Sequence, residues 1–228
     1  MAELLIKNSS VGFIKAIILD KDGTLSNSEE YLLELAKTRV KFAVRKFKKL
    51  KINNFNIFLL RKLLNDIYGL KNRALSANAS LAIASKDQNI ISTATIFTLF
   101  GFDWFKSLTL SQEIFDQVDI FLSTNKADTQ KQRTLISGAF DLLVALKNNG
   151  VYISLMTNDS QAGIEEFISK NKLEGIFDYL WSVENKPSKP NPKAVIELCK
   201  RMEINPSECA LISDADTDLK MAKEADVP

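Results

Sequence analysis

Two aspartates directly follow a hydrophobic segment near the start of the chain, in the stretch AIILDKDGTL at residues 16–25. Asp20 and Asp22 are two positions apart, so their side chains point in the same direction on an extended chain. Neighbouring carboxylates repel each other and resist burial unless a cation balances them. The stretch therefore predicts either a bound cation or a reaction that uses both acids. A plain polar turn, in which Asp and Gly are common, is the alternative.

The composition restricts what this chemistry can be. The 228 residues include no histidine, which excludes Ser-His and Cys-His catalysis and every histidine-based metal site. The two cysteines, Cys199 and Cys209, are not in a metal-like spacing, and we expect reduced thiols in a cytoplasmic protein. Acids, bases and ligands must therefore come mainly from Asp, Glu, Lys or Tyr. Carboxylate and carbonyl oxygens suit magnesium rather than zinc.

The bulk properties give no reason to expect a nucleic acid or a membrane as the partner. The net charge is +2, and the apolar and charged contents of 46% and 25% are ordinary for a globular protein. The apolar run near the start is too short to span a bilayer and ends in acid, which argues against a signal peptide or an anchor. The basic run at 41–51 is interpreted as a solvated helix face rather than a phosphate-binding surface, because Val40, Val44 and Phe47 form an apolar stripe.

Apolar strands and helical segments alternate through the second half of the chain. The expected strands cover residues 13–20, 151–158, 178–183 and 208–214. Strands separated by helices predict a parallel sheet between two helix layers, which is an α/β, Rossmann-like three-layer core.

More than a hundred residues of helical character, without a proline, separate the first two expected strands. This far exceeds an ordinary crossover connection. We therefore expect an all-helical cap domain at 26–130, inserted after strand 1. The core would then consist of 1–25 and 131–228.

Polar residues follow the later strands as well. Thr157 and Asn158 end the second strand, and the segment after the fourth carries Asp214 and Asp218. Ligands of open α/β sheets bind at the carboxyl ends of the strands, so these residues are predicted to lie near the first two aspartates.

A lysine-bearing loop, KPSKPNP at 186–192, lies between these strands. It leads into a helix whose cap is expected at Asn191 and whose first residue is expected at Pro192. A magnesium ion, a lysine and a threonine hydroxyl would together supply the groups that a phosphate dianion needs.

These segments resemble, in order, the four motifs of the haloacid dehalogenase superfamily of phosphohydrolases. The DxDGT motif is present at residues 20–24, and Thr157 matches the Thr or Ser that ends a hydrophobic strand. Lys189 best matches the lysine before a helix, with Lys186 as the alternative. Asp214 and Asp218 match the acidic D-x-x-x-D motif, although Ser213 stands where the family usually has glycine. The resemblance covers the core and does not extend to the insert.

The resemblance implies a role for each matched residue. Asp20 would attack phosphorus and become an aspartyl phosphate, and Asp22 would protonate the leaving alcohol and then activate water. Thr157, Asn158 and Lys189 would bind the phosphoryl oxygens. The metal residues would surround one Mg²⁺: Asp20, Asp22 through its backbone carbonyl, Asp214, and Asp218 as a ligand or support.

The resemblance favours a phosphatase of a small phosphorylated metabolite, such as phosphoglycolate or a sugar phosphate, because the insert occupies the position of caps that close over such substrates. The acid at Asp22 disfavours a dehalogenase, since that branch carries tyrosine there. A phosphomutase, which uses the same residues, and a catalytically silent binding protein stay open. Arg61, Arg73 and Lys86 are candidates for leaving-group contacts by charge alone, and the oligomeric state is not readable.

Overall fold

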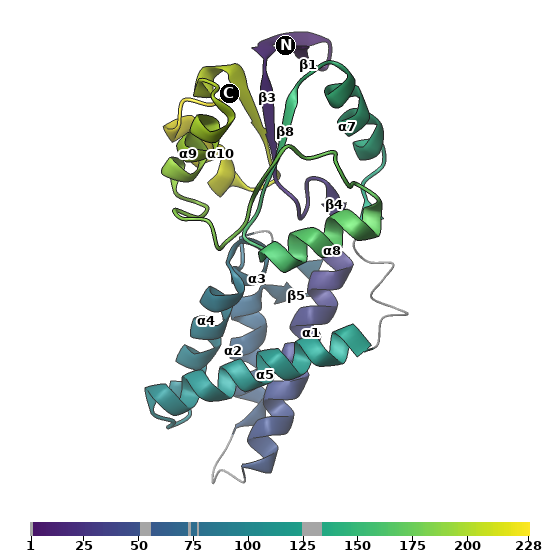
Figure 1. Cartoon of the computed structure of the whole chain (residues 1–228). Helices are drawn as coiled ribbons and strands as arrows, with labels where there is room; N and C mark the ends of the chain where they lie inside the picture. Colours follow the sequence, from purple (N-terminus) through teal and green to yellow (C-terminus); the bar gives the residue numbers. More distant parts are fainter. Residues whose placement is uncertain (1, 51–55, 73, 77, 125–133) are drawn as a thin grey trace. The chain divides into compact units, whose positions relative to one another are not determined.

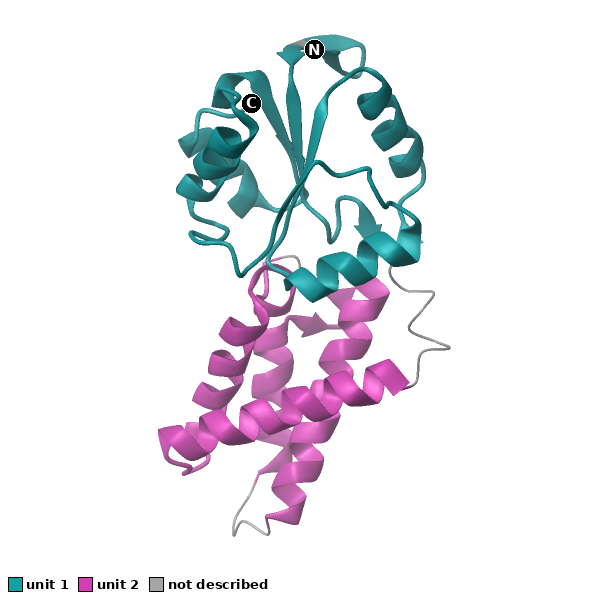
Figure 2. Ribbon diagram, in the orientation of Figure 1, with its two compact units in different colours: residues 1–27, 133–228 teal, residues 28–132 magenta. Residues whose placement is uncertain are grey.

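The computed structural model describes residues 2–50, 56–72, 74–76, 78–124 and 134–228. The chain divides into two compact units, which we call unit 1 (residues 1–27 and 133–228) and unit 2 (residues 28–132) (Figure 2). The first division lies two residues after the expected boundary at 25/26. The second expected boundary, at 130/131, lies outside the described residues.

Unit 1 contains the predicted α/β core. Its four parallel strands lie in the order β10-β3-β8-β9 (Figure 1). The strands are β3 (Ala16–Leu19), β8 (Tyr152–Met156), β9 (Tyr179–Trp181) and β10 (Cys209–Ile212). The helices that accompany them are α7 (Ala139–Asn148), α8 (Gln161–Asn171), α9 (Pro192–Met202) and α10 (Asp216–Glu224).

Every residue of β3 is buried, which shows that the sheet is covered on both faces. Ile18 packs in one hydrophobic cluster with residues of α9 and α10. Its neighbours Ile17 and Leu19 pack in a second cluster with residues of α7 and α8. Alternate side chains of a strand point to opposite faces, so this division produces the predicted three layers.

The expected strand at 13–20 is wrong in its first part. Phe13 and Ile14 belong to β2 (Ser9–Ile14), which pairs antiparallel with β1 (Ala2–Ile6) and not with the parallel sheet. A continuous apolar run does not reveal where one strand stops and the next begins, which explains the error.

Two further backbone contacts involve residues near the ends of the two segments of unit 1. Strand β4 (Ser26–Asn27) pairs antiparallel with β7 (Thr134–Leu135), which joins the segments that precede and follow unit 2 in the sequence. At the outer edge of β10, the Leu211 N–H donates to the Pro228 carbonyl at 3.0 Å.

Unit 2 consists mainly of helices packed around one hydrophobic cluster. They are α1 (Glu29–Lys49), α2 (Ile57–Tyr68), α3 (Ser80–Ile83), α4 (Lys86–Thr98) and α5 (Trp104–Thr124). The predicted apolar stripe of α1 is confirmed, since Val40, Val44 and Phe47 are buried. In the part of the chain that the structure describes, no helix is long and apolar enough to cross a membrane.

The expectation that the insert is all helical missed one ribbon, formed by β5 (Leu70–Lys71) and β6 (Ala74–Leu75). Gly69 ends α2 in the left-handed region, with φ of 78°, which turns the chain into this ribbon. Two-residue strands have too little periodicity to be recognised in a sequence.

Candidate active site

The carboxyl ends of the central strands bring the predicted motifs to one edge of the sheet. Asp20 directly follows β3, and its backbone N–H donates to the Ile212 carbonyl of β10 at 3.0 Å. Thr157 directly follows β8, and its N–H donates to the Trp181 carbonyl of β9 at 2.9 Å. The segments around positions 20, 157 and 214 therefore end side by side.

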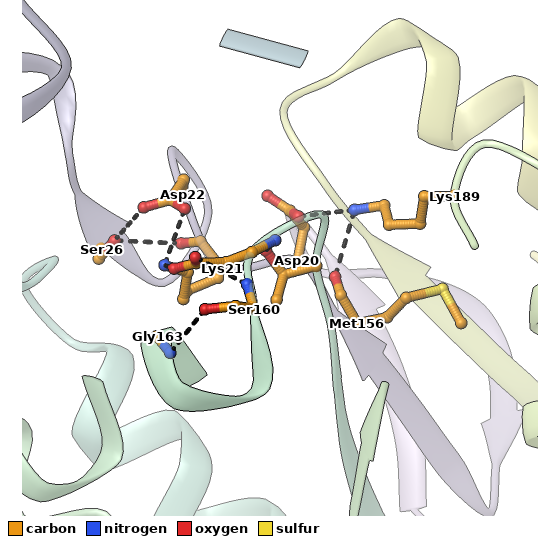
Figure 3. Close-up of polar contacts among 10 residues, drawn as sticks. Asp20, Lys21, Asp22, Ser26, Met156, Ser160, Gly163 and Lys189 are labelled. Carbon is orange, nitrogen blue, oxygen red and sulfur yellow. Dashed lines mark hydrogen bonds and ion pairs between the residues drawn. The ribbon is translucent and has the colours of Figure 1, made fainter. Parts of the chain in front are cut away.

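Lys189 is the centre of a buried cluster at this edge (Figure 3). Its Nζ lies 2.6 Å from Asp20 Oδ1 and 2.5 Å from Asp218 Oδ2. It also donates to the Met156 carbonyl at 3.2 Å. One ammonium group thus links the ends of β3 and β8 with the first turn of α10.

The local sequence explains how Lys189 reaches this position. Helix α9 begins at Pro192, and the Asn191 side chain accepts from the Lys193 N–H, as predicted for a capped helix. The alternative lysine, Lys186, is exposed and donates to the Val183 carbonyl. The structure therefore places Lys189, and not Lys186, beside Asp20.

The carboxyl group of Asp20 has an unusual environment. Burial raises its pKa from 3.8 to about 6, although the adjacent Lys189 ammonium lowers it. Burial lowers the pKa of Lys189, but the carboxylates of Asp20 and Asp218 raise it, and the net shift is upward. Full ionisation of Asp20 near neutral pH is therefore favoured by further positive charge.

Asp218 is buried, and two hydrogen-bonding groups hold its carboxylate. Besides Lys189, Ser213 Oγ donates to Asp218 Oδ2 at 2.7 Å. Ser213 Oγ also accepts from the Ala215 N–H at 3.1 Å, so this serine shapes the turn before α10. The departure from glycine at position 213 thus adds a contact to the site and removes none.

The carboxylate of Asp22 is held by its own loop. Its Oδ2 lies 2.9 Å from Lys21 Nζ, and its Oδ1 accepts from Ser26 Oγ at 3.4 Å. Lys21 is fully buried and also contacts Asp159 Oδ2 at 2.5 Å. Lys21 and Asp159 were missed in the sequence, and the only available signal was a lysine placed between two acids.

Asp214 lies against the backbone that follows Asp22. A Cβ added to Gly23 would stand 2.2 Å from Asp214 Oδ2, so only glycine allows this approach. Gly23 also has φ of 90°, which other residues rarely adopt. The Asp214 N–H donates to Thr24 Oγ1 at 3.1 Å, which fixes the two loops together.

These positions allow a test of the magnesium prediction. Among the described residues, no three His, Cys, Asp or Glu side chains form a group that could hold a metal. The carboxylates of Asp22 and Asp218 are instead directed at lysines. Asp20 also contacts Lys189 through Oδ1, but its carboxylate, the Asp214 carboxylate and the Asp22 carbonyl can supply hard oxygen donors. Mg²⁺ commonly takes one or two carboxylates and completes its shell with water and phosphate oxygens, so this donor set fits.

The second motif is anchored through backbone contacts. Thr157 is buried, and its Oγ1 accepts from the Asp159 N–H at 3.2 Å. Asn158 is half-buried in the same loop. The Ser160 side chain then caps α8 by accepting from the Gly163 N–H.

Two cysteines and three basic residues were also considered in the sequence. Cys199 and Cys209 are free and buried, with their sulfur atoms 3.6 Å apart. In unit 2, Arg61 is exposed and Lys86 pairs with Asp116 and Asp119. Arg73 lies outside the described residues.

Comparison with known proteins identifies the family. Residues 14–226 match the model of the haloacid dehalogenase-like hydrolases. The chain belongs to this family. The match spans the core motifs and the insert, which agrees with the resemblance drawn from the four motifs.

Individual relatives of this haloacid dehalogenase-like chain are distant. It is 25% identical over 117 residues to an uncharacterized hydrolase of Saccharomyces cerevisiae, covering 50% of this chain and 51% of the relative. It is 29% identical over 102 residues to phosphoglycolate phosphatase 1 of Pseudomonas aeruginosa, covering 44% of this chain and 38% of the relative. The matches thus span about half or less of the length of these curated relatives.

Solved structures share the fold. The crystal structure of a predicted phosphoglycolate phosphatase from Haemophilus somnus has a TM-score of 0.62 at 18% identity, covering 93% of this chain and 82% of that one. A β-phosphoglucomutase from Clostridium difficile has a TM-score of 0.60 at 19% identity, covering 94% and 82%. At these identities the likeness concerns the α/β fold.

Proposed function

We propose that this chain is a magnesium-dependent phosphatase that hydrolyses a small phosphorylated metabolite through an aspartyl phosphate on Asp20. The observation that carries the proposal is the cluster in which Lys189 contacts both Asp20 and Asp218 at the end of β3. A buried carboxylate with a perturbed pKa, held by a buried ammonium group, is a common feature of catalytic sites.

The chain's own residues account for both chemical steps. Asp20 attacks phosphorus, and the bond from phosphorus to the leaving oxygen breaks as Asp22 gives that oxygen a proton. Water then attacks the aspartyl phosphate and gives its proton to Asp22, which releases phosphate and regenerates Asp20. Lys189, Thr157 and Asn158 bind the phosphoryl oxygens and oppose the charge of the transition state.

Magnesium would be held by the carboxylates of Asp20 and Asp214 and by the Asp22 carbonyl, and Asp218 supports the site through Lys189. The ion supplies positive charge that lets an anionic carboxylate approach an anionic phosphate. The raised pKa of Asp20 supports this proposal, because Lys189 alone leaves it at about 6.

The proposed substrate class rests on the insert and on the relatives. We propose the division expected from the sequence, with a core of 1–25 and 131–228 and a cap domain of 26–130 that gates access of the substrate by opening and closing. The Pseudomonas relative is named a phosphoglycolate phosphatase. Phosphoglycolate and similarly small sugar phosphates are therefore the first substrates to test.

Phosphate release from a panel of phosphorylated metabolites, with and without magnesium, tests the proposal. We expect turnover of at least one small phosphomonoester, its loss after chelation, and a fall of about 10⁴-fold or more in Asp20→Asn. Transfer of the phosphoryl group within a sugar phosphate, without release, would instead indicate a phosphomutase. A folded wild-type protein that processes none of the panel would favour a binding protein and contradict the proposal.

A further inference from the structure

A second buried lysine directly follows Asp20 in the sequence. Lys21 stands between the two acids of the first motif, and its side chain is fully buried. Its Nζ contacts carboxylates from two loops, Asp22 Oδ2 at 2.9 Å and Asp159 Oδ2 at 2.5 Å. The Phe167 ring lies on another side, with its centroid 5.8 Å from Nζ.

Asp159 is itself fixed by the start of α8. Its Oδ1 accepts from the Ser160 N–H at 2.8 Å, and its own N–H donates to Thr157 Oγ1. A Cβ on Gly163 would stand 2.4 Å from Asp159 Oδ2, so glycine at this position makes room for the carboxylate. The acid cannot move away from Lys21 without disturbing these contacts.

The remaining oxygen of Asp22 is held from the other side. Ser26 Oγ donates to Asp22 Oδ1 at 3.4 Å and also lies 3.3 Å from the Lys21 carbonyl. The Lys21 carbonyl accepts from the Leu25 and Ser26 N–H groups at 3.0 and 2.9 Å. The loop thus closes on itself while Lys21 ties it to the loop that follows β8.

We propose that Lys21 and Asp159 are positioning residues: their buried ion pair holds the Asp22 carboxylate where it exchanges a proton with the leaving-group oxygen. This inference rests on the proposed function and concerns two residues to which the four motifs assign no role. Lys21 contacts the Asp22 carboxylate, but neither Lys21 nor Asp159 is assigned a bond-making or proton-transfer step. The pair acts by limiting the directions that the Asp22 carboxylate can adopt.

A leaving-group comparison tests the role. kcat/KM reports the steps up to formation of the aspartyl phosphate, in which the Asp22 proton reaches the leaving oxygen. An alkyl phosphate needs this proton, whereas p-nitrophenolate leaves readily without it. We expect Lys21→Met to lower kcat/KM by about 100-fold for an alkyl monophosphate and by under about tenfold for p-nitrophenyl phosphate.

Two further variants complete the design. Asp159→Asn keeps the shape of the side chain and should give the same selective loss, and the double variant should lose no more than Lys21→Met, because the two residues act as one unit. Lys147→Met is the control: it removes the partly exposed 2.6 Å pair of Lys147 with Asp178, which is also in unit 1. We expect the control to affect both substrates equally or not at all.

Equal losses on both substrates, or an unchanged kcat/KM for the alkyl phosphate, would show that the pair only stabilises the fold and would overturn the inference. If Lys21→Met does not fold, Asp159→Asn decides the matter by the same comparison. Failure of the proposed function is distinguishable, because a folded wild-type protein would then cleave neither substrate, and the inference would fall with it.

Discussion

Unit 1 and unit 2 both bury positive charge, but they stabilise it differently. In unit 1, Lys21 and Lys189 each contact two carboxylates, with partners as far as 138 and 169 positions away in the sequence. In unit 2, the guanidinium of buried Arg39 lies 3.8 Å from the centroid of the Phe115 ring. The ion pairs of Lys86 in unit 2 are largely exposed.

The difference indicates where the chemistry lies. Removing two opposite charges from water costs about as much free energy as their attraction returns, so a cluster of buried ion pairs is not explained by stability alone. In unit 1 that cluster surrounds a carboxylate with a raised pKa at the edge where α/β proteins bind ligands. In unit 2 the buried cation stacks on an aromatic ring, and the charge of Asp119 also favours it.

Lys189→Met should give the largest effect. It leaves the buried carboxylates of Asp20 and Asp218 without their shared cation, which we expect to cost about 3–5 kcal/mol of unfolding free energy. Activity should fall by about 10³-fold, because a phosphate ligand is lost as well. Denaturant unfolding and kcat measure the two effects.

The same variant should also change the pH dependence of the activity. Lys189 lowers the pKa of Asp20, so its removal should raise that pKa further and move the acid limb of the activity profile to higher pH. The sign follows because attack requires the ionised carboxylate, which is lost as the pH falls. An acid limb that stays in place would contradict the assignment of Asp20 as the group that titrates.

Phe115→Ala should destabilise unit 2 without changing the pH dependence of the activity. Removal of a fully buried phenylalanine costs about 3–5 kcal/mol, and here it also takes the ring from Arg39. Thermal unfolding should show the loss. At a temperature where the variant is folded, the acid limb should keep its wild-type position, because it is set in unit 1.

Asp20→Asn should be more stable than the wild type at pH 7 in the absence of magnesium. The pKa of Asp20 is raised from 3.8 to about 6, so ionisation opposes folding by about 3 kcal/mol above pH 6. The penalty develops as the pH rises from 3.8 to 6 and is absent below 3.8, where the carboxyl group is protonated in both states. The difference in unfolding free energy should therefore vanish in acid, and a difference independent of pH would argue against the raised pKa.

Lys86→Met should have the smallest effect. Its pairs with Asp116 and Asp119 are exposed, so we expect a loss of about 1 kcal/mol or less, which decreases further in salt. A loss as large as that of Lys189→Met would erase the contrast between the two units.

Much of the site could be predicted from the sequence because of strand geometry. Asp20, Thr157 and Asp214 follow strands that are parallel, and parallel strands end at one edge of a sheet. The buried stripe of α1 was equally accessible, since its period is that of a helix. Both inferences depend only on local patterns.

The contacts of the charged side chains could not be predicted. The Asp22 carboxylate contacts Lys21, whose other carboxylate partner, Asp159, lies 137 positions further along the chain than Asp22. The hairpin before β3 was missed for a related reason, because Phe13 and Ile14 extend the apolar run of the buried strand. In both cases the outcome depends on pairing between distant segments.

Capture of the covalent intermediate shows whether Asp20 is the nucleophile. The protein is mixed with a hydrolysable phosphomonoester and magnesium, quenched in acid within one turnover, and analysed by peptide mass spectrometry. We predict one added phosphoryl group on the peptide that contains Asp20, and none in the Asp20→Asn variant. Phosphate release during turnover with no phosphoryl group on Asp20, or with the group on another residue, would contradict the account.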